Sequence, residues 1–126
     1  IHQLTSFIES HRGNESLIHV YTRLSQQIQI SIGDLYRYLG EFSQNSRPVS
    51  VFVTNNAHFQ MATSHYTLAY EIAHEKCTEY KVKQWCEITE GQATALSKLA
   101  CLFTQNVNDD LNAFSSILCA KKLISR

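Results

Sequence analysis

The residues best suited to chemistry lie near the middle of the chain. Glu71 and His74 are three positions apart, and on a helix this spacing places a carboxylate and an imidazole on adjacent turns. Di-iron bundles use two such Glu-x-x-His motifs and two further glutamates. Only one copy occurs here, and the other glutamates do not fall at core positions that would face it. We therefore interpret Glu71 and His74 as a solvated pair on the polar side of a helix.

His74 and Cys77 also have the spacing of two zinc ligands on one helix. A structural zinc site needs four converging ligands, usually as two close pairs. The other cysteines, Cys86, Cys101 and Cys119, are isolated in the sequence, so no second pair is available. A small metal-binding helical protein that uses His74 and Cys77 is thus a minor alternative, and the sequence predicts no cofactor.

No pattern typical of an enzyme is present. No serine or histidine falls in a nucleophile elbow, and the four scattered glycines cannot build a phosphate-binding loop. Eleven basic and eleven acidic residues balance, which argues against bulk electrostatic binding to nucleic acid or anionic lipid. No apolar run approaches the length of a membrane span. We expect a non-enzyme that binds no nucleic acid or small-molecule substrate and does not span a membrane.

The four cysteines fall at apolar or near-apolar positions of expected helices. Free cysteine behaves as a small buried hydrophobe, and the chain is not dense enough in cysteine for a disulfide scaffold. We therefore expect reduced, buried and slowly reacting thiols in an intracellular, cytoplasmic protein. Because the count is even, a secreted four-helix signalling protein with two disulfides stays open as an alternative.

The length of 126 residues, with 44% apolar and 17% charged residues, predicts one folded domain, 1–126. The chain begins at Ile1 without a methionine, so we expect it to be a fragment of a longer protein.

The cleanest helical pattern runs over residues 15–43. Its apolar residues recur at alternating steps of four and three: Leu17, Tyr21, Leu24, Ile28, Ser31, Leu35, Tyr38 and Phe42. A flanking row of Ile18, Ile32 and Leu39 widens this stripe beyond the seam of a two-stranded coiled coil, so we expect it to face two neighbouring helices in the core. The opposite face is polar and is expected to be solvated: Arg23, Gln26, Gln27, Arg37 and Glu41.

A second helical stretch, residues 56–105, contains no proline and only one glycine, Gly91. Its apolar face slips by about one position between Lys81 and Gln84, which indicates either a stutter in one helix or the seam between two. Glycine costs about 1 kcal/mol in a helix interior relative to alanine, so Gly91 is the expected place for a break. We favour one continuous helix, which gives a second long helix over 56–90 or 56–105.

These patterns predict an all-α fold, an antiparallel bundle of four or five helices with two long ones. A short helix is expected over His2–His11, and residues 49–53 are expected to cross the bundle in an extended form. The last helix follows Asn108. Its expected packing face consists of four residues: Leu111, Phe114, Leu118 and Ile124.

A continuous 56–105 helix would be longer than the helices that could cover it. Apolar surface around Trp85, Ile88 and Leu99 should then stay uncovered, with Tyr80 at its margin. We expect this surface to bind a protein partner or a second copy, with Trp85 as the anchor. The long helices resemble those of membrane-trafficking and scaffold bundles. The sequence thus favours a protein–protein interaction or scaffold module of a trafficking or assembly complex, with coiled-coil-type packing.

Overall fold

The protein is all-helical over the residues that the computed structural model describes, which are 15–45, 57–72 and 82–124. The elements are α2 (Glu15–Asn45), α3 (Ala57–Ile72), α4 (Val82–Leu102), a π-helical turn η1 (Phe103–Val107) and α5 (Asp110–Ile124). The predicted all-α class is confirmed. The short helix expected over 2–11 and the extended crossing expected over 49–53 lie outside the described residues.

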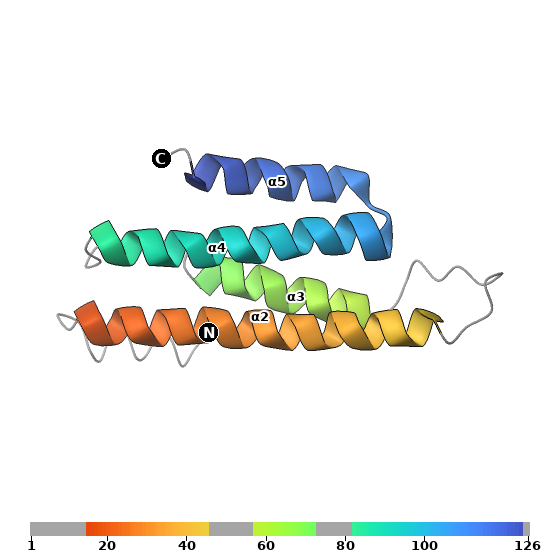
Figure 1. Ribbon diagram of the computed structural model, residues 1–126, viewed down its shortest axis with the longest axis horizontal. Coiled ribbons are helices and arrows are strands. Elements are labelled where there is room, and N and C mark those ends of the chain that lie inside the picture. Colours follow the sequence, from red (N-terminus) through yellow and green to blue (C-terminus); the bar gives the residue numbers. More distant parts are fainter. Residues whose placement is uncertain (1–14, 46–56, 73–81, 125–126) are drawn as a thin grey trace.

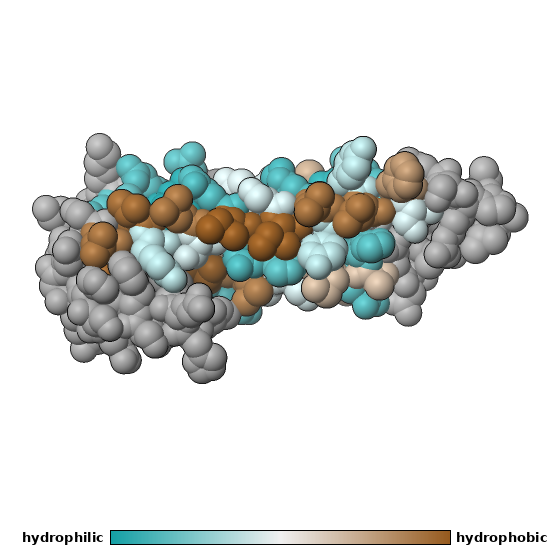
Figure 2. Space-filling view, turned by 90° about the horizontal axis from the view of Figure 1, so that it is seen from below, coloured by the Kyte–Doolittle hydropathy of each residue, from teal (hydrophilic) through white to brown (hydrophobic). Residues whose placement is uncertain are grey.

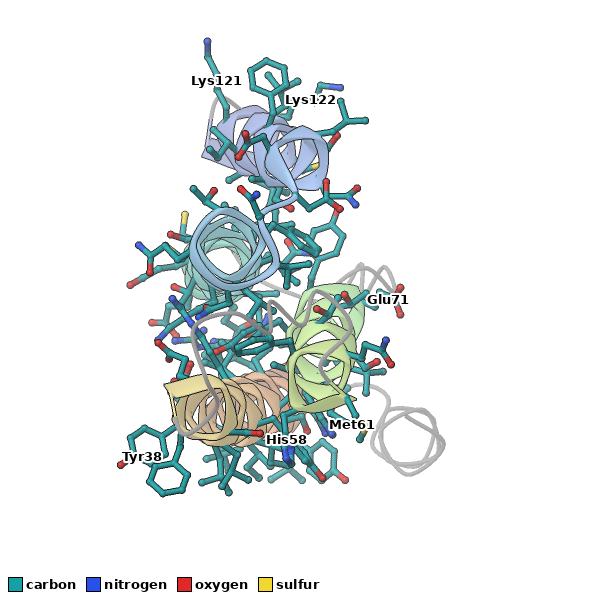
Figure 3. The ribbon with its side chains drawn as sticks, turned by 90° about the vertical axis from the view of Figure 1, so that its right-hand side faces the viewer. Tyr38, His58, Met61, Glu71, Lys121 and Lys122 are labelled. Atoms are coloured by element: carbon teal, nitrogen blue, oxygen red, sulfur yellow. The ribbon has the colours of Figure 1, made fainter. Side chains whose placement is uncertain are left out.

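The helices alternate in direction and form an elongated stack (Figure 1). α3 is antiparallel to α2, because Tyr66 lies against Gly33, whereas Phe59, which comes earlier in α3, lies against Gly40, which comes later in α2. α4 turns back along α3, and α5 turns back along α4. α2, α3 and α4 contact one another, whereas α5 packs on α4 and η1 at the end of the stack away from α2 (Figure 3). The predicted antiparallel bundle is confirmed.

The expected continuous helix over 56–105 is wrong. The Gln92 side chain in α4 donates a hydrogen bond of 3.2 Å to the backbone carbonyl of Tyr70 in α3. In one continuous helix these residues would be about 33 Å apart. The chain therefore reverses between Ile72 and Val82, close to the slip in the apolar pattern. Gly91 does not break the helix but lies buried within α4.

The turn from α4 to α5 follows from two polar residues. Asn108 ends η1 in the left-handed conformation, with φ of 57°, which asparagine tolerates better than most residues. The Asp109 carboxylate then accepts a hydrogen bond of 3.1 Å from the backbone N–H of Asn112 and caps the start of α5.

The hydrophobic core lies between α3 and α4 and extends to the end of α5. Its buried members come from all three helices: Phe59, Ala62, Tyr66, Leu96, Leu99, Leu102 and Leu123. Because α3 and α4 supply most of these side chains, the two helices form the centre of the bundle.

The face of α2 that packs inward is not the predicted stripe, although Ile18 of its flanking row is buried as expected. The other buried residues of α2 are small or polar: Thr22, Gln26, Gly33 and Gly40. Of the residues expected to be solvated, Gln26 is fully buried and only Gln27 and Glu41 are exposed. Most of the other large apolar residues that were expected in the core are instead exposed, whereas Tyr21 and Ile32 are partly buried. The inward face needs small residues at positions 33 and 40 because aromatic rings of α3 lie directly against the backbone at Gly33 and Gly40.

α5 shows the same inversion. Its buried side is narrow and mostly small, with Ala113 at 4%, Ser116 at 8% and Leu123 at 8% exposure. Leu111 and Phe114, expected in the packing face, are exposed by 78% and 60%. Leu118 is also exposed, whereas the side chain of Ile124 lies outside what the structure describes. Small residues let α5 approach α4 closely, which leaves the large residues outside.

Candidate interaction surface

The most prominent surface feature is a continuous apolar band along α2 (Figure 2). We call it the α2 stripe and define it by eight residues: Leu17, Tyr21, Leu24, Ile28, Ser31, Leu35, Tyr38 and Phe42. The alternating steps of four and three repeat every seven residues over more than three heptads. This period is that of a coiled-coil seam rather than of a straight helix, which repeats every 3.6 residues. The stripe extends over about 37 Å at ~1.5 Å per residue.

The large side chains of this surface are about half exposed. Their exposures range from 39% at Leu39 and 40% at Leu17 to 67% at Tyr38 and Phe42, and Val20 adds a flanking residue at 52%. A half-exposed large side chain leaves on the order of 100 Å² uncovered, so six exposed residues of the stripe, together with Val20 and Leu39 beside it, present roughly 800 Å². The largest apolar patch of a typical monomer is only about 300–600 Å². No charged residue belongs to the stripe.

Contacts on the opposite side of α2 determine that the stripe points outward. A Cβ at Gly33 would be 2.6 Å from the Tyr66 ring, and one at Gly40 would be 2.5 Å from the Phe59 ring. Only glycine allows these rings to lie on the α2 backbone. In the end-on view, Tyr38 points away from the other helices (Figure 3).

Polar side chains join α2 to α4 and to η1 on the same inward side. The Gln26 amide donates a hydrogen bond of 3.2 Å to the Ile88 carbonyl and accepts one of 3.0 Å from Arg23. The side chain of Arg37 donates to Asn106 at 2.7 Å and to Gln105 at 2.8 Å. Rotating α2 to bury the stripe would break these bonds and leave buried polar groups without partners, which costs about 1–3 kcal/mol each.

A cluster of three ionisable side chains joins three helices. The Tyr66 hydroxyl donates a hydrogen bond of 2.5 Å to Asp34, and Lys98 lies 3.1 Å and 3.2 Å from the two oxygens of the same carboxylate. Burial, together with the bond to Asp34, raises the pKa of Tyr66 above its ordinary value of 10.0. Tyr66 therefore stays protonated at neutral pH and serves as a fixed donor. The cluster holds α2, α3 and α4 together.

The described histidines also connect helices. Tyr36 stacks on His65 with ring centroids 5.5 Å apart and on His58 at 6.4 Å, which joins α2 to α3. His19 lies 2.8 Å from Glu87 and joins α2 to α4. Among the residues of known position, no group of three histidine, cysteine or acidic side chains could hold a metal ion. The predicted ligands His74 and Cys77 are not among these residues.

Two residues of the interface predicted on α4 are not exposed. Ile88 is fully buried and Leu99 is 6% exposed, because α4 packs against α2, α3 and α5. The expected uncovered surface at these two residues is therefore absent. Tyr80 lies outside the described residues, as does the side chain of Trp85, so their interface roles stay predictions. The α2 stripe was visible in the sequence as a strict 3.5-residue period, but it was assigned to the core.

Cys86, Cys101 and Cys119 are free and exposed. The expected burial of these three thiols is therefore wrong, while Cys77 is not described. An open groove between α2, α4 and α5 is lined by Cys101 together with Arg37 and Lys98. Both cations that line the groove already bind side chains of their own chain. None of the helices described is long and apolar enough to cross a membrane.

Comparison with protein-family models, curated proteins and solved structures finds no match to this chain. The α2 stripe is therefore interpreted from its own geometry.

Proposed function

We propose that this chain is a non-enzymatic interaction module that binds another helix along the α2 stripe. The observation that supports it is the outward position of an uncharged, roughly 800 Å² apolar face on a helix with a strict coiled-coil period. A surface of this size is close to what one partner buries in a standard protein interface.

The shape of the stripe favours a helical partner. It is one helix wide, about 37 Å long, and its residues alternate as the a and d positions of a heptad. Knobs-into-holes packing requires the partner to present the same period. The buried polar contacts behind the stripe hold α2 in place, so the face is ready for binding without rearrangement of the bundle.

The polar clusters support a non-enzymatic role. Asp34, Lys98 and Arg37 are used in contacts between helices, and Tyr66 is held as a protonated donor. Scaffolding in an assembly or trafficking complex is the setting in which such a module would act. The described cysteines and histidines lend no specific support to the two-disulfide or the metal-binding alternative.

A photo-reactive phenylalanine analogue at Leu35 tests this proposal in the cells that make the protein. We expect a discrete adduct whose cross-linked peptide carries a heptad apolar pattern. Ile28→Glu introduced together with the analogue should abolish the adduct, since a buried unpaired charge disfavours the contact. The matched control is the analogue at Met61, an exposed apolar residue of α3 outside the stripe. Equal labelling from Leu35 and Met61 would refute the proposal.

A further inference from the structure

We infer that the helix bound by the α2 stripe is α2 of a second copy of this chain, in antiparallel orientation. This inference rests on the proposed function and names the partner.

The order of residues along the stripe is nearly the same in both directions. In an antiparallel dimer centred between Ile28 and Ser31, each stripe residue meets one stripe residue of the other copy. The eight resulting pairs are of four kinds, and each kind occurs twice. They pair Leu17 with Phe42, Tyr21 with Tyr38, Leu24 with Leu35, and Ile28 with Ser31 of the other copy. Each a position then meets a d position, as antiparallel coiled-coil packing requires. A surface that complements itself under a two-fold rotation is the requirement for a closed dimer.

A parallel pair is less favourable. It places Ser31 against Ser31 in the middle of the apolar seam, which leaves a gap between two small polar residues. The antiparallel pair instead places Ser31 beside the larger Ile28, so that small and large residues interdigitate. The flanking positions do not oppose this arrangement, since Glu41 then faces Val20 and Asp34 faces Gln27, with no like charges opposite each other.

The apolar face of α5 does not fit the stripe. The exposed large apolar residues of α5 are Leu111, Phe114, Ile117 and Leu118, which span about 10 Å along the helix, against about 37 Å for the stripe. A second α2 has the matching length by definition. The roughly 800 Å² that each copy contributes equals the share of one partner in a standard interface, so a single contact is large enough for a specific dimer.

Sedimentation velocity of the purified protein tests the association. We expect a reversible monomer–dimer equilibrium without larger species, because the two stripes close on each other. Ile28→Glu should weaken dimerisation by about a hundredfold or more, since it places two charges near the two-fold axis. Met61→Glu should leave the equilibrium unchanged. Circular dichroism of both variants checks that the helices are retained.

Cross-linking tests the orientation in a background where the native cysteines are replaced by serine. Leu24→Cys mixed with Leu35→Cys should give disulfide-linked heterodimers, whereas each variant alone should give little product. In the antiparallel pair, two copies of residue 24 lie about 16 Å apart along the axis, beyond the reach of a disulfide. Efficient linkage of Leu24→Cys to itself would overturn the antiparallel arrangement.

The outcomes separate this inference from the proposed function. A monomer at every concentration, combined with a specific Leu35 photo-adduct to a different protein, would refute self-association and leave the interaction module standing. A monomer without any specific adduct would refute both. Growing oligomers that Phe114→Glu abolishes would show a contact between α2 and α5 and would also overturn the antiparallel dimer.

Discussion

The Tyr66 ring lies on the backbone of α2 at Gly33, so close that a Cβ there would be 2.6 Å from a ring carbon. Phe59 meets Gly40 in the same way one heptad further along. These two ring-on-glycine contacts set the register of α2 against α3. They also explain why the large apolar residues of α2 face outward.

Gly33→Ala and Gly40→Ala should each destabilise the protein by about 2 kcal/mol, because the added methyl group displaces a buried ring. On an open helix surface the same change would stabilise by about 0.5–1 kcal/mol. Urea unfolding followed by circular dichroism measures the difference. Ser31→Ala, on the exposed side of α2, is the control and, at protein concentrations where the chain is monomeric, should change stability by less than about 0.5 kcal/mol. Stabilisation by either glycine substitution would contradict the packing described.

Gly91→Ala should be destabilising, but by less than Gly33→Ala. A methyl group at Gly91 would overlap the ends of the Gln26 and Arg23 side chains, which can move more easily than a packed ring. The displacement of Gln26 would weaken its bond to Ile88, at about 1 kcal/mol. If Gly91 were only a weak point in a helix, alanine would instead stabilise by about 1 kcal/mol. The sign of the change in unfolding free energy therefore decides between the two roles.

Ile18 and Ile28 both lie on α2 but differ in burial, and their truncation should differ accordingly. Ile18 is fully buried, so Ile18→Ala should cost about 2–4 kcal/mol. Ile28 is 55% exposed, so Ile28→Ala should change monomer stability by less than about 0.5 kcal/mol. Unfolding is measured at protein concentrations where the chain is monomeric. A larger loss of stability for Ile28→Ala than for Ile18→Ala would show that the stripe belongs to the core.

Tyr66→Phe should reduce the loss of stability at high pH. The pKa of Tyr66 is raised in the folded state, so above about pH 10 the unfolded chain loses this proton first. The unfolded state then binds fewer protons than the folded one, and stability falls as pH rises. At neutral pH the substitution should cost about 1–1.5 kcal/mol through the lost bond to Asp34. Comparing urea unfolding of both proteins at about pH 8 and about pH 11 isolates the Tyr66 contribution. If Tyr66→Phe and the unmodified protein lost the same stability between these pH values, Tyr66 would make no contribution to the pH dependence.

Cys86, Cys101 and Cys119 should be alkylated in the native protein, since all three thiols are exposed. We expect rates within about tenfold of those in denaturant. Mass spectrometry of peptides after a timed iodoacetamide pulse assigns the rate of each cysteine. Strong protection of any of the three would show that its position is covered, by a partner or by a bond to another thiol.

Much of the fold was determined by the sequence alone. The spacing of apolar residues predicted helices at residues 15–43 and after Asn108, and only residues 49–53 were expected to be extended. The four-three spacing also grouped residues that share one face of α2, although it assigned that face to the core. Local spacing suffices for this, because residues that share a helical face do so whatever the helix packs against.

The tertiary structure decided which face of each helix is inside. An apolar stripe has the same pattern whether it meets the core or another molecule, so periodicity could not distinguish these cases on α2 or α5. The burial of Gln26 depends on its hydrogen bond to Ile88 on another helix, and the requirement for glycine at position 33 depends on the Tyr66 ring. The reversal between Ile72 and Val82 is likewise a product of packing, since it brings Gln92 to the Tyr70 carbonyl. Such pairings between distant residues appear only when the helices are placed together.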